Sequence, residues 1–220
     1  MNYDNYIFQG GNMKTVLFQG DSITDAGRNR ENDLFRGSGY ATLVSASLGL
    51  KYPNEYEFIN RGIAGVGVAN LLMRDLPDFL SIAPDYISIL IGVNDALYET
   101  KERGSIDTER FSAVYRLLLG EIKKYLPKSK VILMTPFLLS GSATDELFGD
   151  YRKSVEKAVA VVKDIANDRS LPIIDLLGVF DEYAKKYNSA TLLYDGVHPT
   201  AMGHEIIKNE WLKAFEKIKE

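Results

Sequence analysis

The stretch TVLFQGDSIT, residues 15–24, decides how the chain folds, because an apolar run leads directly into a turn of small polar residues. Short runs of this kind, rich in β-branched residues, are typical of buried strands. Four similar runs follow at residues 57–60, 86–91, 131–134 and 172–175. Strands that alternate with longer amphipathic stretches predict right-handed crossovers and a parallel sheet.

The stretches between these runs are predicted to be helices. Residues 40–48 and 68–80 form the first two, and three later stretches carry apolar residues three or four positions apart, at 111–125, 155–165 and 206–218. Stripes of this kind face a hydrophobic core. The predicted fold class is therefore α/β, a three-layer sandwich of five parallel strands with helices on both faces. Ligands of such folds bind at the carboxyl ends of the strands.

Composition and charge limit what the protein can be. The 220 residues are 45% hydrophobic and 25% charged, which suits one globular domain, predicted over residues 13–220 behind an N-terminal tail of residues 1–12. The net charge of -4 and the scattered basic residues predict no nucleic acid partner. The absence of cysteine excludes disulfides and thiol nucleophiles. No apolar run reaches the roughly 18 residues of a membrane span, and no signal-like segment begins the chain, so a cytoplasmic protein is expected.

Ser22 lies just past the end of the first predicted strand, beside Gly20. At this place a side chain is exposed on the ligand side of the sheet, so Ser22 is a candidate nucleophile. The alternative interpretation is structural, because serine often caps helices and Gly-Asp-Ser is common in turns.

The motif Asp195-Gly-Val-His198-Pro supplies a partner for such a serine. A serine hydroxyl needs a base, and an imidazole needs an acceptor that fixes its tautomer. Asp195 can fold back onto the ring of His198 across the glycine. Alternatively, Asp195 only caps a turn and His198 is solvated. The other histidine, His204, lies within the last predicted helix and is expected to pack or to meet solvent.

Two further loops carry candidate donors for a developing oxyanion. Asn94, at the end of the third predicted strand, has a side-chain amide, and such donors are each worth about 3 kcal/mol in a transition state. Residues 60–65 contain Gly62 and Gly65, and a glycine lets a backbone N–H approach a ligand closely. The structural alternatives are an Asn-Asp turn in the first case and glycines that serve only the turn in the second.

These loops together predict an ester hydrolase with a serine nucleophile, although the chain lacks the Gly-x-Ser-x-Gly elbow of the α/β-hydrolases. The segments 20–24, 60–65, 92–95 and 195–199 resemble, in order, the four sequence blocks of the GDSL, or SGNH, hydrolase family. The resemblance implies a flavodoxin-like sheet of strand order 2-1-3-4-5. It also implies the site residues and their roles: Ser22 as nucleophile and N–H donor, Gly65 and Asn94 as donors, Asp195 as orienter and His198 as base.

A finer resemblance concerns the substrate. Residues 20–28, the pair Gly39-Tyr40 and residues 132–137 resemble the family branch that contains acetylxylan esterases. That branch removes acetyl groups from sugars and is often oligomeric, which allows a homo-oligomer here. The resemblance implies a short-chain acyl esterase acting on a small-molecule or oligosaccharide ester, without metal or organic cofactor. A lysophospholipase or thioesterase of the same family is the alternative.

Two irregular stretches follow strands and are expected to overhang the site. The first, residues 25–39, is polar and basic, which suits a hydroxyl-rich leaving group or, alternatively, only a solvated surface. The second, residues 137–150, carries apolar residues that are candidates to hold an acyl chain or a partner subunit: Phe137, Leu138, Leu139 and Phe148. A different class, a nucleotide- or flavin-binding module with residues 20–24 as its phosphate loop, leaves Asp195 and His198 without a role. A carbohydrate-binding module without catalysis has the same weakness.

Overall fold

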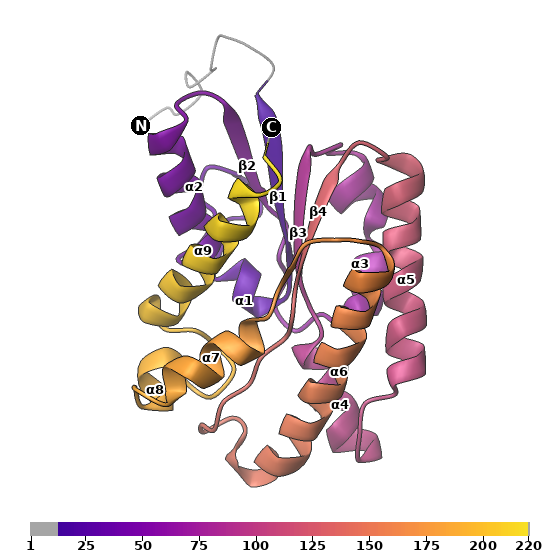
Figure 1. The fold of residues 1–220 in the computed structure, drawn as a ribbon, viewed down its shortest axis with the longest axis vertical. Helices are drawn as coiled ribbons and strands as arrows, with labels where there is room; N and C mark the ends of the chain where they lie inside the picture. The colour runs from indigo at the N-terminus through magenta and orange to yellow at the C-terminus, as the bar shows by residue number, and fades with distance from the viewer. Residues whose placement is uncertain (1–12, 220) are drawn as a thin grey trace.

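The computed structural model describes residues 13–219, so the predicted tail of residues 1–12 lies outside the described part of the chain. Five parallel strands form one sheet in the order β2-β1-β3-β4-β5, which confirms the predicted fold class and strand order (Figure 1). The strands are β1 (Lys14–Gly20), β2 (Tyr56–Asn60), β3 (Tyr86–Leu90), β4 (Lys130–Met134) and β5 (Ile173–Ile174).

Helices cover both faces of this sheet (Figure 1). On one face α2 (Tyr40–Lys51) packs against α9 (Ala201–Glu216), and on the other α5 (Thr108–Tyr125) lies between α3 (Val68–Met73) and α6 (Phe148–Asp168). The remaining helical elements are short or lie at the carboxyl edge: α1 (Ser22–Asp25), η1 (Leu76–Leu80), α4 (Val93–Arg103), η2 (Asp145–Leu147), α7 (Leu176–Ala184) and α8 (Ser189–Leu192).

The predicted helix over residues 68–80 is broken in the structure. The α-helical part, α3, ends at Met73, and a separate π-helical turn, η1, begins at Leu76. Pro77 explains the break, because proline donates no backbone hydrogen bond and its ring clashes with the carbonyl four residues earlier, here that of Met73.

The helix α4 was not predicted from the sequence. It begins shortly after β3 and ends at Arg103. The next residue, Gly104, caps it with φ +83°, the left-handed conformation that favours glycine. Lys101 and Arg103 lie in its last turn, where positive charge interacts favourably with the helix dipole. Because α4 starts at Val93, Asn94 lies in a first helical turn and not in a loop.

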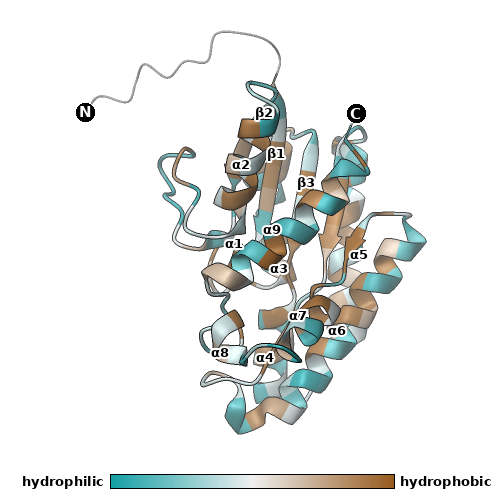
Figure 2. Ribbon diagram, turned by 60° about the vertical axis from the view of Figure 1, so that its left-hand side comes forward, coloured by the Kyte–Doolittle hydropathy of each residue, from teal (hydrophilic) through white to brown (hydrophobic). Residues whose placement is uncertain are grey.

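The apolar residues of the strands are buried between the two helical layers, and the outer faces of the helices are largely hydrophilic (Figure 2). The ring of Phe18 lies 5.5 Å from that of Trp211, which joins β1 to α9. Of the described helices, none is long and apolar enough to cross a membrane.

One expectation about the loop after β4 is wrong. Phe137, Leu138 and Leu139 are buried in the hydrophobic core, and Phe148 is partly buried against it. The ring of Phe137 stacks on that of Phe180 in α7, with 4.4 Å between centroids. These side chains continue the core beyond the end of β4, so they are not free to hold an acyl chain or a partner subunit.

Candidate active site

Ser22 lies at the carboxyl end of β1, where the strand turns into the short helix α1. The side chain of Asp21 caps this helix, because its Oδ1 accepts a hydrogen bond from the N–H of Ile23 at 3.0 Å. The interpretation of Ser22 as the helix cap is therefore wrong, and its hydroxyl is available for another contact. Gly20 lets β1 approach β3 closely, since a Cβ on it would lie 2.3 Å from the carbonyl oxygen of Leu90.

Ser22, His198 and Asp195 form a chain of hydrogen bonds. The Oγ of Ser22 lies 2.9 Å from Nε2 of His198, and Nδ1 of His198 lies 2.7 Å from Oδ2 of Asp195. The other carboxyl oxygen of Asp195 accepts from the backbone N–H groups of Val197 and His198, at 2.9 and 2.8 Å. Asp195 thus caps the turn and contacts the imidazole at the same time. Asp195 therefore makes both of the contacts considered for it, with the turn and with the ring. His198 is not merely solvated, because it also contacts Ser22.

The turn that carries His198 is fixed by its own backbone. Leu193 and Pro199 form an antiparallel bridge, and the N–H of Tyr194 donates to the carbonyl of His198 at 2.7 Å. Gly196 has φ +96°, which a side chain would strain. The glycine between Asp195 and His198 therefore lets the two side chains meet.

The electrostatics of the pair suit an orienting carboxylate. The side chain of His198 is 47% exposed and that of Asp195 is 27% exposed. Burial raises the pKa of Asp195, but hydrogen bonds from the backbone and imidazole of His198 and from the N–H of Val197 outweigh it and hold that pKa below its usual value. Asp195 is therefore an ionised acceptor at neutral pH, which can fix the imidazole tautomer.

The two glycines after β2 have different environments. The N–H of Gly62 donates to Oδ1 of Asn60 at 2.9 Å, and a Cβ on Gly62 would lie 2.4 Å from the backbone nitrogen of Asp25. Gly62 thus packs this loop against α1. Gly65 is exposed and has φ +80°, and no hydrogen bond to its N–H is made by the described part of the chain. Of the two, only Gly65 has an N–H available to a ligand.

Asn94 lies beside this loop. Its Nδ2 donates to the carbonyl of Val66 at 2.9 Å, which leaves the second amide hydrogen for another acceptor. Tyr98, one turn further along α4, places its hydroxyl 3.6 Å from the position a Cβ on Gly65 would take. The alternative that Asn94 only satisfies its own backbone is wrong, since its amide reaches across to residue 66.

Two basic residues of the 25–39 loop, Arg28 and Arg36, bond to backbone carbonyls of the protein. Nε of Arg28 donates to the carbonyl of Gly62 at 2.7 Å, and Nε of Arg36 donates to that of Phe58 at 2.8 Å. In the same region Arg61 forms a two-pronged salt bridge with Asp33. These contacts fasten the loop to β2 and the segment after it, so Arg28 and Arg36 are not simply solvated.

Two buried carboxyl groups next to the site were missed from the sequence. Asp21 is fully buried, and this burial raises its pKa to about 7. Burial also raises the pKa of Asp95 to about 6, although a hydrogen bond from the N–H of Val68 lowers it. Their only sequence signal is that they adjoin Ser22 and Asn94.

His204 packs inside the protein, which is the first of the two environments predicted for it. Its Nδ1 accepts from the backbone N–H of Tyr40 at 3.1 Å, at the start of α2. Burial lowers its pKa to about 4, so it is neutral at physiological pH. His204 therefore has a structural role, and it is not a second candidate for the base.

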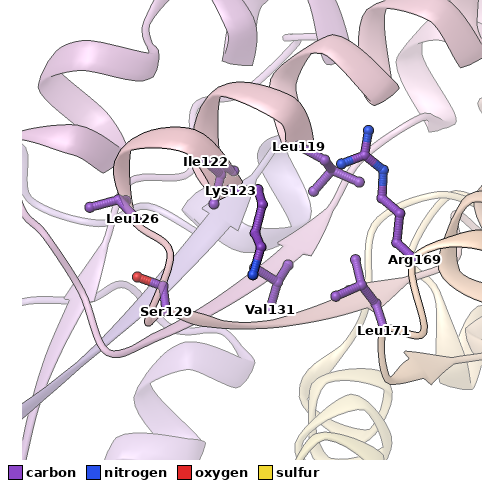
Figure 3. A pocket seen from close by; sticks show the side chains of 8 residues that line it. All are labelled: Leu119, Ile122, Lys123, Leu126, Ser129, Val131, Arg169 and Leu171. Carbon is purple, nitrogen blue, oxygen red and sulfur yellow. The ribbon is translucent and has the colours of Figure 1, made fainter.

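Within the described residues, no group of three or more His, Asp or Glu side chains is placed to hold a metal ion. A hollow of about 250 Å³ lies between α5 and the amino end of β4, at the opposite end of the sheet from Ser22 (Figure 3). Lys123 and Arg169 flank its apolar lining, and its one hydroxyl, that of Ser129, donates to the carbonyl of Pro84 at 2.5 Å. It contains no nucleophile paired with a base.

Comparisons with known proteins agree with this fold. Residues 18–206 match the GDSL-like Lipase/Acylhydrolase family. The chain is 33% identical over 221 residues to an acetylxylan esterase of Geobacillus stearothermophilus, covering 95% of this chain and 98% of that protein.

Solved structures give the same result. The crystal structure of that bacterium's acetylxylan esterase Axe2 superposes with a TM-score of 0.80 at 32% identity, over 93% of this chain and 94% of the other. LAE5, an alpha/beta hydrolase from a lake metagenome, superposes with a TM-score of 0.81 at 27% identity, over 94% and 97% of the two chains. Structures of Axe2 also include catalytic mutants of a serine, an aspartate and a histidine.

The sheet order and these similarities define a carboxylic ester hydrolase. The chain belongs to the GDSL-like lipase/acylhydrolase family.

Proposed function

We propose that the protein is a serine esterase that removes short acyl groups, most directly acetyl, from carbohydrate esters. The observation that carries this proposal is the contact chain from Ser22 through His198 to Asp195. The substrate class is supported by the similarity to an acetylxylan esterase and to Axe2, which is also described as an acetyl-xylooligosaccharide esterase.

The proposed cycle begins when Nε2 of His198 takes the proton of Ser22 and the serine oxygen attacks the ester carbonyl. Asp195 accepts the Nδ1 hydrogen and stabilises the imidazolium that forms. The oxyanion is bound by the N–H groups of Ser22 and Gly65 and by the amide of Asn94. These donors stabilise negative charge that exists only in the transition state and the intermediate.

The second half of the cycle uses the same groups. His198 gives its proton to the leaving alcohol, and an acyl-enzyme remains on Ser22. Water, deprotonated by His198, then attacks the acyl group. The bond to Ser22 breaks, the carboxylic acid leaves, and His198 returns the proton to the serine oxygen. The cycle balances without a metal or an organic cofactor, because one imidazole moves every proton.

Aromatic side chains near the site support a sugar as leaving group. Tyr98, next to Gly65, is 56% exposed, and Tyr194, next to Asp195, is 70% exposed. A tyrosine presents an apolar ring and a polar tip, which matches the C–H face and the hydroxyls of a pyranose. Three of the apolar residues expected to hold an acyl chain are core residues, which favours a short acyl group: Phe137, Leu138 and Leu139.

The test compares acetylated xylo-oligosaccharides with p-nitrophenyl acetate and p-nitrophenyl octanoate. We expect acetate release from the oligosaccharides and faster cleavage of the acetyl than of the octanoyl ester, all abolished in a folded Ser22→Ala variant. Faster octanoyl cleavage would point to the lysophospholipase or thioesterase alternative. Turnover like that of the wild type in Ser22→Ala would exclude Ser22 as the nucleophile.

A homo-oligomer and a cytoplasmic location stay predictions. Light scattering coupled to size-exclusion chromatography would test the first, and a monomer at micromolar concentration would contradict it.

A further inference from the structure

The segment that follows Gly65 is fastened to the first turn of α4 by two adjacent side chains. Nδ2 of Asn94 donates to the carbonyl of Val66, and both carboxyl oxygens of Asp95 accept from the N–H of Val68, each at 3.1 Å. These bonds hold Val66 and Val68, which closely follow Gly65 in the chain.

Gly67 shows how closely Asp95 approaches this segment. Its φ is -107° and its ψ is -177°, an extended conformation that any residue adopts. A Cβ on Gly67 would nevertheless lie 2.6 Å from Oδ1 and 2.9 Å from Oδ2 of Asp95. A side chain at this position would have to displace the carboxyl group, because the segment rests directly against it.

The environment of Asp95 opposes a charged side chain at this position. The side chain is half-buried, and burying a carboxylate is costly unless its hydrogen bonds compensate. Glu99 from the same helix repels it, while Arg110 of α5 attracts it. An apolar residue at this position would leave the N–H of Val68 without these two acceptors.

We propose that Asp95 is a positioning residue that keeps the Gly65 N–H aimed at the oxyanion by fixing residues 66–68. This inference rests on the proposed function, in which Gly65 is a donor. A preorganised donor stabilises the oxyanion only when it is held in place before the charge develops, and displacements of about 1 Å are costly. Asp95 touches neither substrate nor reacting atoms, so it acts through the loop.

The test uses steady-state hydrolysis of p-nitrophenyl acetate by full-length variants. For Asp95→Ala we expect kcat to fall about tenfold to a hundredfold, at most the effect of removing a donor outright, with KM within about twofold. Gly67→Ala should give the same kinetic pattern, because its methyl group displaces the carboxylate. Asp95→Asn retains one acceptor oxygen for Val68 and should recover most of the lost kcat.

A matched control separates positioning from stability. Asp107 also accepts from a backbone N–H, that of Arg110 at 3.0 Å, but it caps the exposed start of α5. We expect Asp107→Ala to lower the melting temperature and to leave kcat unchanged. The double variant Gly67→Ala/Asp95→Ala should lose no more kcat than Asp95→Ala alone, because both changes break the same contact.

A folded Asp95→Ala or Gly67→Ala variant with unchanged kcat, or with a change confined to KM, would overturn the proposal. If Asp95→Ala does not fold, Gly67→Ala alone decides in the same way. Ser22→Ala is measured in parallel: if it stays active, the proposed function fails, whereas an inactive Ser22→Ala beside a fully active Gly67→Ala defeats only the role of Asp95.

Discussion

The Oγ of Ser22 lies 2.9 Å from Nε2 of His198, although 176 positions separate the two residues in the chain. The parallel sheet explains this contact, because β1 ends at the carboxyl edge and the turn before α9 passes over the same edge. Each half of the pair is held by its own local structure: α1 is capped by Asp21, and the turn of His198 is capped by Asp195. The nucleophile and the base are thus placed by two rigid segments, and single side-chain changes can test each role.

The first prediction concerns Asp195. Asp195→Asn should lower kcat by about three to four orders of magnitude, because an amide favours the wrong imidazole tautomer. The turn should remain folded, since the asparagine oxygen can still accept from the N–H groups of Val197 and His198. Steady-state kinetics with p-nitrophenyl acetate measure the effect. Asp85→Asn is the control, because Asp85 also accepts from a backbone N–H, that of Thr15, at the far end of the sheet. A loss of kcat below tenfold would contradict the orienting role.

The second prediction concerns the oxyanion. Asn94→Ala should lower kcat about a hundredfold or more, because it removes one donor and also the bond to the Val66 carbonyl. Substrate affinity should change little, since the ground-state carbonyl carries no full charge. Asn209→Ala serves as control, because Asn209 is exposed on α9 and, among the described residues, its amide contacts only Glu205. An effect of Asn94→Ala on KM alone would argue against the oxyanion role.

The third prediction separates a fastening role of Arg28 from sugar binding. Arg28→Ala should lower the free energy of unfolding by about 1–2 kcal/mol, because it breaks the bond to the Gly62 carbonyl. The ratio of kcat/KM for acetylated xylo-oligosaccharides to that for p-nitrophenyl acetate should stay constant. Arg30→Ala is the control, since the side chain of Arg30 is 60% exposed. A selective loss of oligosaccharide activity in Arg28→Ala would show that Arg28 contacts the sugar.

Local sequence predicts the strands, because apolar runs mark them. The strand order comes instead from the resemblance of four short blocks to one family, and the same blocks predict the site residues Ser22, Gly65, Asn94, Asp195 and His198. The helix α4 could not be predicted, because its buried residues are few and small: Val93, Ala96 and Thr100. The contact of Asp95 with Val68 spans 27 positions and depends on how the loop after β2 folds, which no local pattern records.

The prediction from apolar runs is wrong where a run continues beyond the end of a strand. Phe137 and Leu138 follow β4 and were expected in an overhanging loop, but they are fully buried. Period and composition cannot distinguish a buried segment without regular structure from a loop over a site. Only the packing of Phe137 on Phe180 in α7 decides between them.

The last prediction concerns the pH dependence of stability and depends on Asp21. Burial raises its pKa from 3.8 to about 7, and its Oδ2 is buried without a hydrogen-bond partner among the described residues. Between these pH values the folded protein holds a proton that the unfolded chain releases. The free energy of unfolding should therefore fall as the pH rises from about 4 through 7, by on the order of 4 kcal/mol at most.

Asp21→Asn removes this titration and keeps an acceptor for the N–H of Ile23. The variant should be more stable than the wild type at pH 8, where the wild type buries a charge, and nearly equal to it at pH 4. Asp95, with a pKa of about 6, keeps part of the slope in both proteins. His204 opposes it in both, because its lowered pKa of about 4 makes stability fall as the pH drops below 6.5. Urea unfolding at both pH values measures the difference, with Asp107→Asn as an exposed control. An equal stability change at pH 4 and pH 8 would mean that Asp21 is charged at both, and that its burial does not set its pKa.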